Sequence, residues 1–256
     1  MWCDLDAGRV FVATGGVPFD PARPVVLLVH GAGADHSVWA LQSRGLARRG
    51  CAVLACDLPG HGRSGGTAPA TIAAVADRLA ELLAAVGAAR ATVVGHSMGA
   101  LAALDLAARH PDRVGGLVLL GAAARMPVHP DLLAAARDDL PRAAAMIAAW
   151  GHGGGAGGVP GLYPPALTRR LVEASPPGAL AAGLAACDAY DGTEAAARVR
   201  APTLLLLGGA DRMSPAKAGQ ALAGLIPGAR VTRLEGAGHM LMADRPEAVL
   251  DALLTR

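Results

Sequence analysis

Residues 93–101 read Val93-Val94-Gly95-His96-Ser97-Met98-Gly99-Ala100-Leu101, and this stretch decides the fold. A β-branched pair ends a strand, Gly-X-Ser-X-Gly follows, and an Ala/Leu run that favours helix comes next. This order predicts a nucleophile elbow, a sharp strand-to-helix turn that lifts a serine hydroxyl above a sheet. Such a turn strains the backbone of its central residue. Gly95 and Gly99 leave room where a Cβ would meet neighbouring backbone.

The segments around this stretch show whether the motif is an elbow or a chance match, since the chain holds 34 glycines. Short apolar runs that read as buried strands alternate with helical patterns on both sides of the motif. The expected strands are 2–5, 9–13, 25–29, 51–56, 91–94, 116–120, 203–207 and 231–234, and the expected helices between them include 38–49, 72–86, 98–109, 215–226 and 246–254. This alternation predicts an α/β fold, in which an eight-stranded, mostly parallel sheet carries helices on both faces.

The alternation stops between residues 122 and 199, where helical patterns (130–150, 165–174 and 179–190) follow one another without a strand. We therefore predict one α/β core made of 1–121 and 200–256, with 122–199 as a helical cap insertion. Six of the eight residues from Gly151 to Gly158 are glycine. Such a segment changes conformation at low cost, so it is either a mobile gate over the site or a passive surface loop.

Composition excludes several classes of protein. The 256 residues are 53% hydrophobic and 17% charged with a net charge of +2, which describes a globular chain without the basic surface of a nucleic-acid binder. The N-terminus lacks the pattern of a signal peptide, and glycines and prolines interrupt the longest uncharged stretch, so no membrane span is expected. The cysteines, Cys3, Cys51, Cys56 and Cys187, lack metal-site spacing. We interpret them as reduced thiols of a cytoplasmic protein without metal or cofactor. Oligomeric state cannot be read from the sequence.

Three residues supply the chemistry that an attacking serine needs. Ser97, Asp211 and His239 each directly follow an apolar strand, in the chain order expected for a triad on this kind of sheet. Histidine would take the serine proton, and a carboxylate would hold the histidine tautomer. The stretch 121–124 contains no carboxylate, which favours Asp211 as the acid. Asp57 is interpreted as a turn anchor, whereas Glu235 and Asp244 are too close in sequence to His239 to reach the opposite ring nitrogen.

With these motifs in place, the chain resembles the α/β-hydrolase fold serine hydrolases. The resemblance is carried by His30-Gly31, the loop 57–64, the elbow, Gly208-Gly209-Ala210-Asp211 and Gly236-Ala237-Gly238-His239. It implies that the backbone N–H of Ala32 joins that of Met98 in an oxyanion hole. Relatives that cleave haloalkanes or epoxides carry aspartate at the nucleophile position, so serine argues against both reactions.

The predicted function is hydrolysis of a small or medium carboxylic ester through an acyl-enzyme on Ser97. The alternatives are an enol-lactone or carbon–carbon bond hydrolase of the same fold, a lyase that uses the same base, and a slow-turnover ligand sensor with an intact triad. Trp150 and Met240 are candidate walls of the substrate pocket. His30, His61 and His96 are interpreted as structural hydrogen-bonding residues, and His36, His129 and His152 as surface or cap residues.

Overall fold

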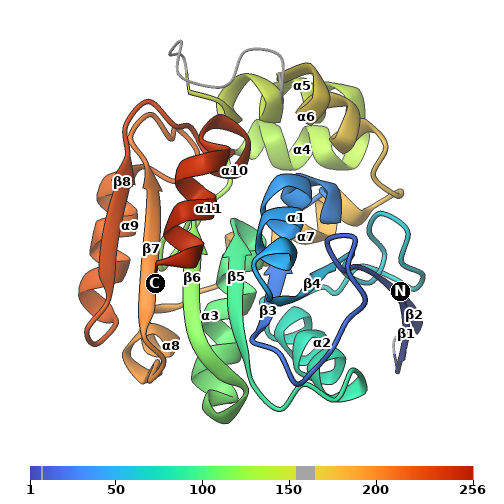
Figure 1. Ribbon diagram of the computed structural model, residues 1–256. Coiled ribbons are helices and arrows are strands. Elements are labelled where there is room, and N and C mark those ends of the chain that lie inside the picture. The colour runs from blue at the N-terminus through green and yellow to red at the C-terminus, as the bar shows by residue number, and fades with distance from the viewer. Residues whose placement is uncertain (7, 154–164, 256) are drawn as a thin grey trace.

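The computed structural model describes residues 1–6, 8–153 and 165–255 and shows a central sheet between two layers of helices (Figure 1). The strands are β1 (Trp2–Leu5), β2 (Gly8–Ala13), β3 (Val25–Val29), β4 (Ala52–Cys56), β5 (Ala91–His96), β6 (Val114–Leu120), β7 (Thr203–Gly208) and β8 (Arg230–Leu234). They form one 8-stranded sheet in the order β1-β2-β4-β3-β5-β6-β7-β8.

Most neighbours in this sheet are parallel. The strands β3 to β8 pair in parallel, while β2 runs antiparallel to both β1 and β4. The predicted eight-stranded, mostly parallel sheet is therefore confirmed. Strands β3 to β7 are almost wholly buried on both faces, which explains their continuous runs of Val and Leu.

Helices cover both faces of the sheet. The helical segments before the cap are η1 (His36–Trp39), α1 (Ala40–Arg48), α2 (Ile72–Ala85), α3 (Met98–Arg109) and η2 (Pro111–Arg113), and those after it are α9 (Ala216–Leu225), α10 (Leu241–Asp244) and α11 (Pro246–Leu254). One apolar layer joins the sheet to α2, α3 and α9. The opposite layer joins it to η1, α1, α10 and α11. The short helix α10 was not expected from the sequence.

The segment between β6 and β7 is helical in its described part, and much of it lies above the sheet in Figure 1. Its helices are α4 (Pro130–Asp138), α5 (Leu140–Gly151), α6 (Pro165–Glu173), α7 (Ala179–Ala189) and α8 (Thr193–Arg198). Side chains of α4 to α7 form a separate apolar cluster. The helix expected over 130–150 is two helices, so that expectation was wrong. Asp139 has extended φ of −151° and accepts the N–H of Arg142, which begins α5 afresh.

The glycine-rich segment divides at the edge of the described residues. Gly151 ends α5, and His152 and Gly153 are also described, but the positions 154–158 lie outside the described residues. The expected gate therefore stays a prediction. Within 1–6, 8–153 and 165–255, every helix is too short or too polar to span a bilayer.

Candidate active site

Ser97 lies at the sharp turn between β5 and α3. Its φ of +54° makes it the one non-glycine residue with positive φ among the described residues. A Cβ on Gly95 would lie 2.2 Å from the carbonyl oxygen of Gly99, and a Cβ on Gly99 would lie 2.5 Å from that of His30. Only glycine permits this close backbone approach. The turn expected from the sequence is therefore present, with the strained residue at its centre.

Asp211 and His239 meet although 28 positions separate them. The Nδ1 atom of His239 lies 2.9 Å from Oδ2 of Asp211, and both side chains are buried. The Oδ1 atom of Asp211 accepts the backbone N–H groups of Met213 and Ser214, each at 2.8 Å. Burial raises the pKa of Asp211, but the charge and hydrogen bond of His239 and these two N–H groups outweigh burial and lower it.

The ionised carboxylate determines the tautomer of the histidine. An ionised carboxylate only accepts hydrogen bonds, so Nδ1 of His239 carries the proton and Nε2 of the neutral ring has a free lone pair. The Nε2 atom is buried and makes no hydrogen bond within the part of the chain that the structure describes. It is therefore free to accept a proton.

Two neighbours hold the His239 imidazole and its backbone in place. A Cβ on Gly121, directly after β6, would lie 2.9 Å from Nδ1 of His239, so only glycine leaves room for the ring. His96 donates from Nε2 to the backbone carbonyl of His239 at 2.9 Å. Burial lowers the pKa of His96 to about 3, which keeps this ring neutral. The expected structural role of His96 agrees with this contact.

The loop after β3 lies close to Ser97. A Cβ on Gly31 would lie 3.2 Å from Cβ of Ser97. A Cβ on Gly183 of α7 would meet both Cβ of Ala32 at 2.8 Å and Sδ of Met98 at 2.9 Å. The side chains of the two residues expected to supply the oxyanion hole thus both lie next to one glycine of α7. Met98 is also the first residue of α3, where helix N–H groups are unpaired.

Ser97 and His239 open into a shared cavity of about 330 Å³ that α4, α5 and α7 help to line. The other residues lining it are Met126, Pro127, Val128, His129, Leu132, Trp150, Leu184, Cys187, Arg212 and Met213. The wall is mostly apolar, with His129 and Arg212 as its polar members. A cavity of this size and character suits a small organic substrate.

The family is decided by a match over most of the chain. The family model described as the alpha/beta hydrolase family matches residues 26–252. The chain belongs to this family. The hydrolase is 33% identical to the pimeloyl-[acyl-carrier protein] methyl ester esterase of Neisseria meningitidis serogroup B, over 87% of this chain and 88% of the relative.

Solved structures agree with this assignment. The enol-lactonase of Burkholderia xenovorans LB400 superposes with a TM-score of 0.88 at 25% identity, covering 99% of this chain and 98% of the lactonase. A thermophilic esterase of Thermogutta terrifontis gives a TM-score of 0.85 at 26% identity, covering 99% and 96%. The predicted class, a carboxylic ester hydrolase of the α/β-hydrolase fold, is therefore confirmed.

The two candidate wall residues lie in different places in the hydrolase. Trp150 lines the cavity and packs edge-on against His129, with ring centroids 5.7 Å apart. Met240 is buried in the apolar layer next to α10 and α11, outside the residues that line the cavity. His129 is exposed and is the N-cap residue of α4. His152 is buried and is the C-cap residue of α5, so of the two alternatives given for it, surface or cap, the cap alternative agrees with the structure.

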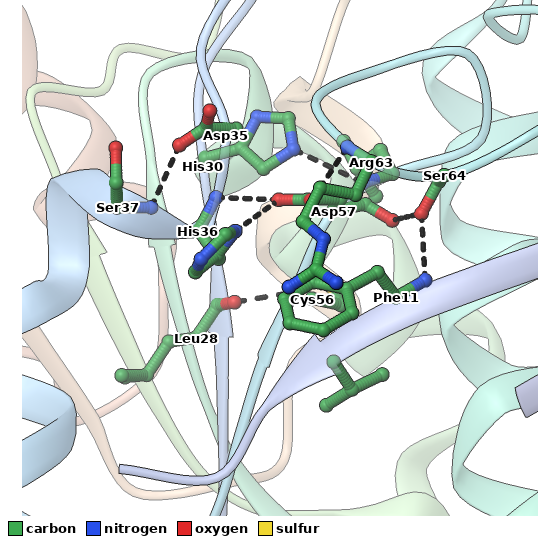
Figure 2. A network of polar contacts seen from close by, with 12 residues as sticks. Phe11, Leu28, His30, Asp35, His36, Ser37, Cys56, Asp57, Arg63 and Ser64 are labelled. Atoms are coloured by element: carbon green, nitrogen blue, oxygen red, sulfur yellow. Dashed lines mark hydrogen bonds and ion pairs between the residues drawn. The ribbon is translucent and has the colours of Figure 1, made fainter. Parts of the chain in front are cut away.

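Asp57 lies in a separate network on the loop after β4, shown in Figure 2. Its Oδ1 accepts the N–H and the Nδ1–H of His36, both at 2.7 Å, and its Oδ2 accepts the N–H of Arg63 at 2.9 Å. Its backbone carbonyl accepts the hydroxyl of Ser64 at 2.7 Å. These contacts agree with the expected role of Asp57 as a turn anchor.

Asp57 also belongs to the one group of possible metal ligands found among the described residues, whose other members lie between β3 and α1. Ligand atoms of Asp35, His36 and Asp57 lie within 4.8 Å of one another. However, Asp35 already accepts the N–H of Ser37 at 2.8 Å, and Asp57 is occupied as described above. The carboxylate oxygens that could bind a metal already accept hydrogen bonds from this chain, so we assign no metal to this group.

Proposed function

We propose that the hydrolase cleaves carboxylic esters through an acyl-enzyme on Ser97. The observation that carries this proposal is the buried Nε2 of His239, which has no hydrogen-bond partner in the described part of the chain. The ring opens with Ser97 into one cavity, and Asp211 holds its Nδ1–H. Nε2 would take the proton of Ser97 as Oγ attacks the ester carbon. Asp211 would stabilise the imidazolium that forms, without itself taking the proton.

The remaining steps follow from the same groups. The N–H groups of Ala32 and Met98 would hold the negative oxygen of the tetrahedral intermediate. The imidazolium then gives its proton to the leaving alkoxide, and the alcohol departs. Water attacks the acyl-enzyme after losing a proton to His239, and that proton returns to Oγ as the carboxylic acid leaves. The ester, one water molecule and the side chains of Ser97 and His239 balance both halves of the reaction.

The substrate we propose is an ester with a small or medium acyl chain and a small alcohol. The apolar wall of the cavity, including Trp150 and Leu132, suits a hydrocarbon chain, and about 330 Å³ limits its length. A relative that acts on a methyl ester supports the small alcohol. A lactone is the second candidate, because an enol-lactonase shares the fold over 99% of this chain.

The same proposal covers the division of the chain and its location. The segment 122–199 would be a cap over the core formed by 1–121 and 200–256, which the separate apolar cluster of α4 to α7 supports. All four cysteines lie in described segments as free thiols, which supports a cytoplasmic location. The partner would be a small molecule, and neither nucleic acid nor membrane takes part.

Turnover of model substrates tests the proposal. The substrates are p-nitrophenyl esters of rising acyl length, with lactones and 1,3-diketones beside them, and Ser97→Ala is the control enzyme. We expect repeated turnover on the short and medium esters. A single burst without turnover would instead support the ligand sensor, and turnover confined to diketones would support carbon–carbon bond cleavage.

A further inference from the structure

A second buried acid–histidine pair lies next to the His239 loop. His152, just after α5 of the cap, places Nδ1 at 2.6 Å from Oδ1 of Asp244 at the end of α10. The Nε2 atom of His152 lies 2.8 Å from the hydroxyl of Thr168 in α6. His152 and Asp244 are each 9% exposed and Thr168 is 1% exposed. The three side chains therefore join two cap helices to the core through buried hydrogen bonds.

The carboxylate of Asp244 also holds two backbone N–H groups. Its Oδ2 accepts Gly238 N–H at 2.7 Å and Gly153 N–H at 2.9 Å. Burial raises the pKa of Asp244, but hydrogen bonds from His152 and from these two N–H groups outweigh burial and lower it. The carboxylate is thus ionised and can only accept, so Nδ1 of His152 donates to it. Gly238 is the residue directly before His239.

Cap and loop also touch backbone to backbone at this point. A Cβ on Gly153 would lie 2.0 Å from the carbonyl oxygen of Gly236, and one on Gly238 would lie 2.4 Å from the backbone nitrogen of Gly153. Met240 donates its N–H to the carbonyl of Gly151 at 2.8 Å. The end of α5 and the loop 236–240 therefore pack as one unit, with no room for a side chain between them.

We propose that Asp244 is a positioning residue for His239, which it holds through the N–H of Gly238 while it anchors the end of the cap helix α5 through Gly153 and His152. This role rests on the function proposed for Ser97 and His239. His96 restrains the carbonyl of His239 from the elbow side. Asp244 restrains the N–H of Gly238, so the backbone that carries the imidazole is held by one buried hydrogen bond on each side of the His239 Cα atom.

The size of the expected effect follows from how sharply proton transfer depends on geometry. A displacement of about 1 Å at a reacting group can cost on the order of 10²-fold in rate. In Asp244→Asn, an amide NH₂ replaces one acceptor oxygen and faces either the ring N–H of His152 or the two backbone N–H groups of Gly153 and Gly238. At least one of the restraints on the loop or the cap is therefore lost.

Asp244→Asn is tested against Asp105→Asn, a matched loss of a buried carboxylate. Asp105 is 6% exposed and accepts Arg109 at 2.6 Å and Tyr190 at 3.1 Å, and it lies outside the residues that line the cavity. We measure kcat and KM on a short ester, and the rate at which a fluorophosphonate labels Ser97. We expect Asp244→Asn to lower kcat and the labelling rate by about 10- to 100-fold. Asp105→Asn should keep kcat and the labelling rate within about 3-fold of wild type, even if its Tm falls by as much as that of Asp244→Asn.

Hydrogen exchange gives a readout that does not depend on activity. Peptides covering 236–240 and 148–153 should exchange faster in Asp244→Asn than in the wild type. In Asp105→Asn their exchange rates should equal those of the wild type. If Asp244→Asn does not fold, Gly153→Ala takes its place. This variant keeps every polar side chain and separates the two backbones, so it should change labelling and exchange in the same direction. Wild-type labelling and exchange in Asp244→Asn would overturn the proposal.

Thr168→Val separates the role of Asp244 from that of the cap as a whole. It removes one hydroxyl and leaves the bond from Gly238 to Asp244 in place, so labelling should stay within about 3-fold of wild type. A loss equal to that of Asp244→Asn would overturn the assignment to Asp244. If Ser97→Ala keeps its turnover, the proposed function fails, whereas the exchange result still tests the positioning role.

Discussion

Two hydroxyl–histidine–aspartate arrays in this hydrolase resemble each other in composition and differ in setting. In one, Asp211 holds Nδ1 of His239 at 2.9 Å, and in the other Asp244 holds Nδ1 of His152 at 2.6 Å. The Nε2 atom of His152 is occupied by Thr168, while that of His239 has no partner among the described residues. An acid–histidine pair is therefore a common structural device, and it becomes catalytic only beside an accessible nucleophile.

The backbone of each hydroxyl residue accounts for the difference. Ser97 occupies a turn with φ of +54° and opens into the cavity, whereas Thr168 lies inside α6 and is 1% exposed. The Thr168 hydroxyl is buried and already hydrogen-bonded to His152, so it is not presented to a substrate. A third pair, His36 with Asp57, is shown in Figure 2, and there the hydroxyl of Ser64 donates to the backbone carbonyl of Asp57 rather than pairing with the histidine. The three pairs can be separated by substitution.

The largest expected effect comes from the two hydroxyls. Ser97→Ala should lower kcat/KM by about 10⁴- to 10⁶-fold, since loss of a triad member removes the nucleophilic route. Thr168→Val should change it by less than about 3-fold, because Thr168 acts inside the cap. Steady-state kinetics on one p-nitrophenyl ester gives both values. A Ser97→Ala enzyme that keeps a tenth of its activity would contradict the comparison.

The acids should differ by almost as much. Asp211→Asn should lower kcat by about 10⁴-fold, because the amide favours the wrong tautomer of His239. Asp57→Asn should leave kcat within about 3-fold, since Asp57 contacts His36 and Arg63 but not the cavity. The measurement is kcat for folded protein, with circular dichroism as the control. A well-folded but inactive Asp57→Asn would reverse the two assignments.

Asp57→Asn should leave activity nearly unchanged but should lower the stability of the fold. The carboxylate of Asp57 accepts three hydrogen bonds, two from the backbone N–H and ring N–H of His36 and one from the backbone N–H of Arg63. Its replacement by asparagine should lower the free energy of unfolding by about 2–4 kcal/mol, because an NH₂ then faces buried donors. Urea unfolding measures this loss. An unchanged urea midpoint would show that the loop after β4 does not depend on this carboxylate.

The smallest effect is a pH dependence of stability that this pair produces. The hydrogen bond to Asp57 raises the pKa of His36, against burial, and this contribution is lost as pH rises through the raised pKa. Burial raises the pKa of Asp57, but its hydrogen bonds from His36 and Arg63 outweigh burial and lower it. Its contribution is therefore lost as pH falls through the lowered pKa. Asp57→Asn should flatten the profile of urea midpoint against pH on both sides.

His36→Asn serves as the matched control for this profile. Asparagine can still donate to Asp57 but does not titrate, so the fall on the alkaline side should disappear while the fall on the acid side remains. A wild-type profile in both variants would show that other groups set the pH dependence.

The amino-acid sequence by itself determined the sheet and the location of the site. The elbow at Ser97, the apolar runs and the chain order of Asp211 and His239 are local signals. The carboxyl ends of parallel strands bring such residues to one edge. The sequence pattern did not reveal the break between α4 and α5 at Asp139, because the apolar spacing of a helix continues across this residue although its φ is extended.

Only the tertiary structure revealed the surroundings of His239. Asp244 and His152 are 92 positions apart, and the sequence indicates Asp244 only as a rival acid for His239. Gly121 and Gly153 look like ordinary loop glycines in the sequence, yet each leaves room for one particular neighbour, the imidazole or the backbone of the 236–238 loop. Such roles depend on which distant atoms fill the space next to a residue. Local patterning does not record this, because it reflects only the period of the element in which the residue lies.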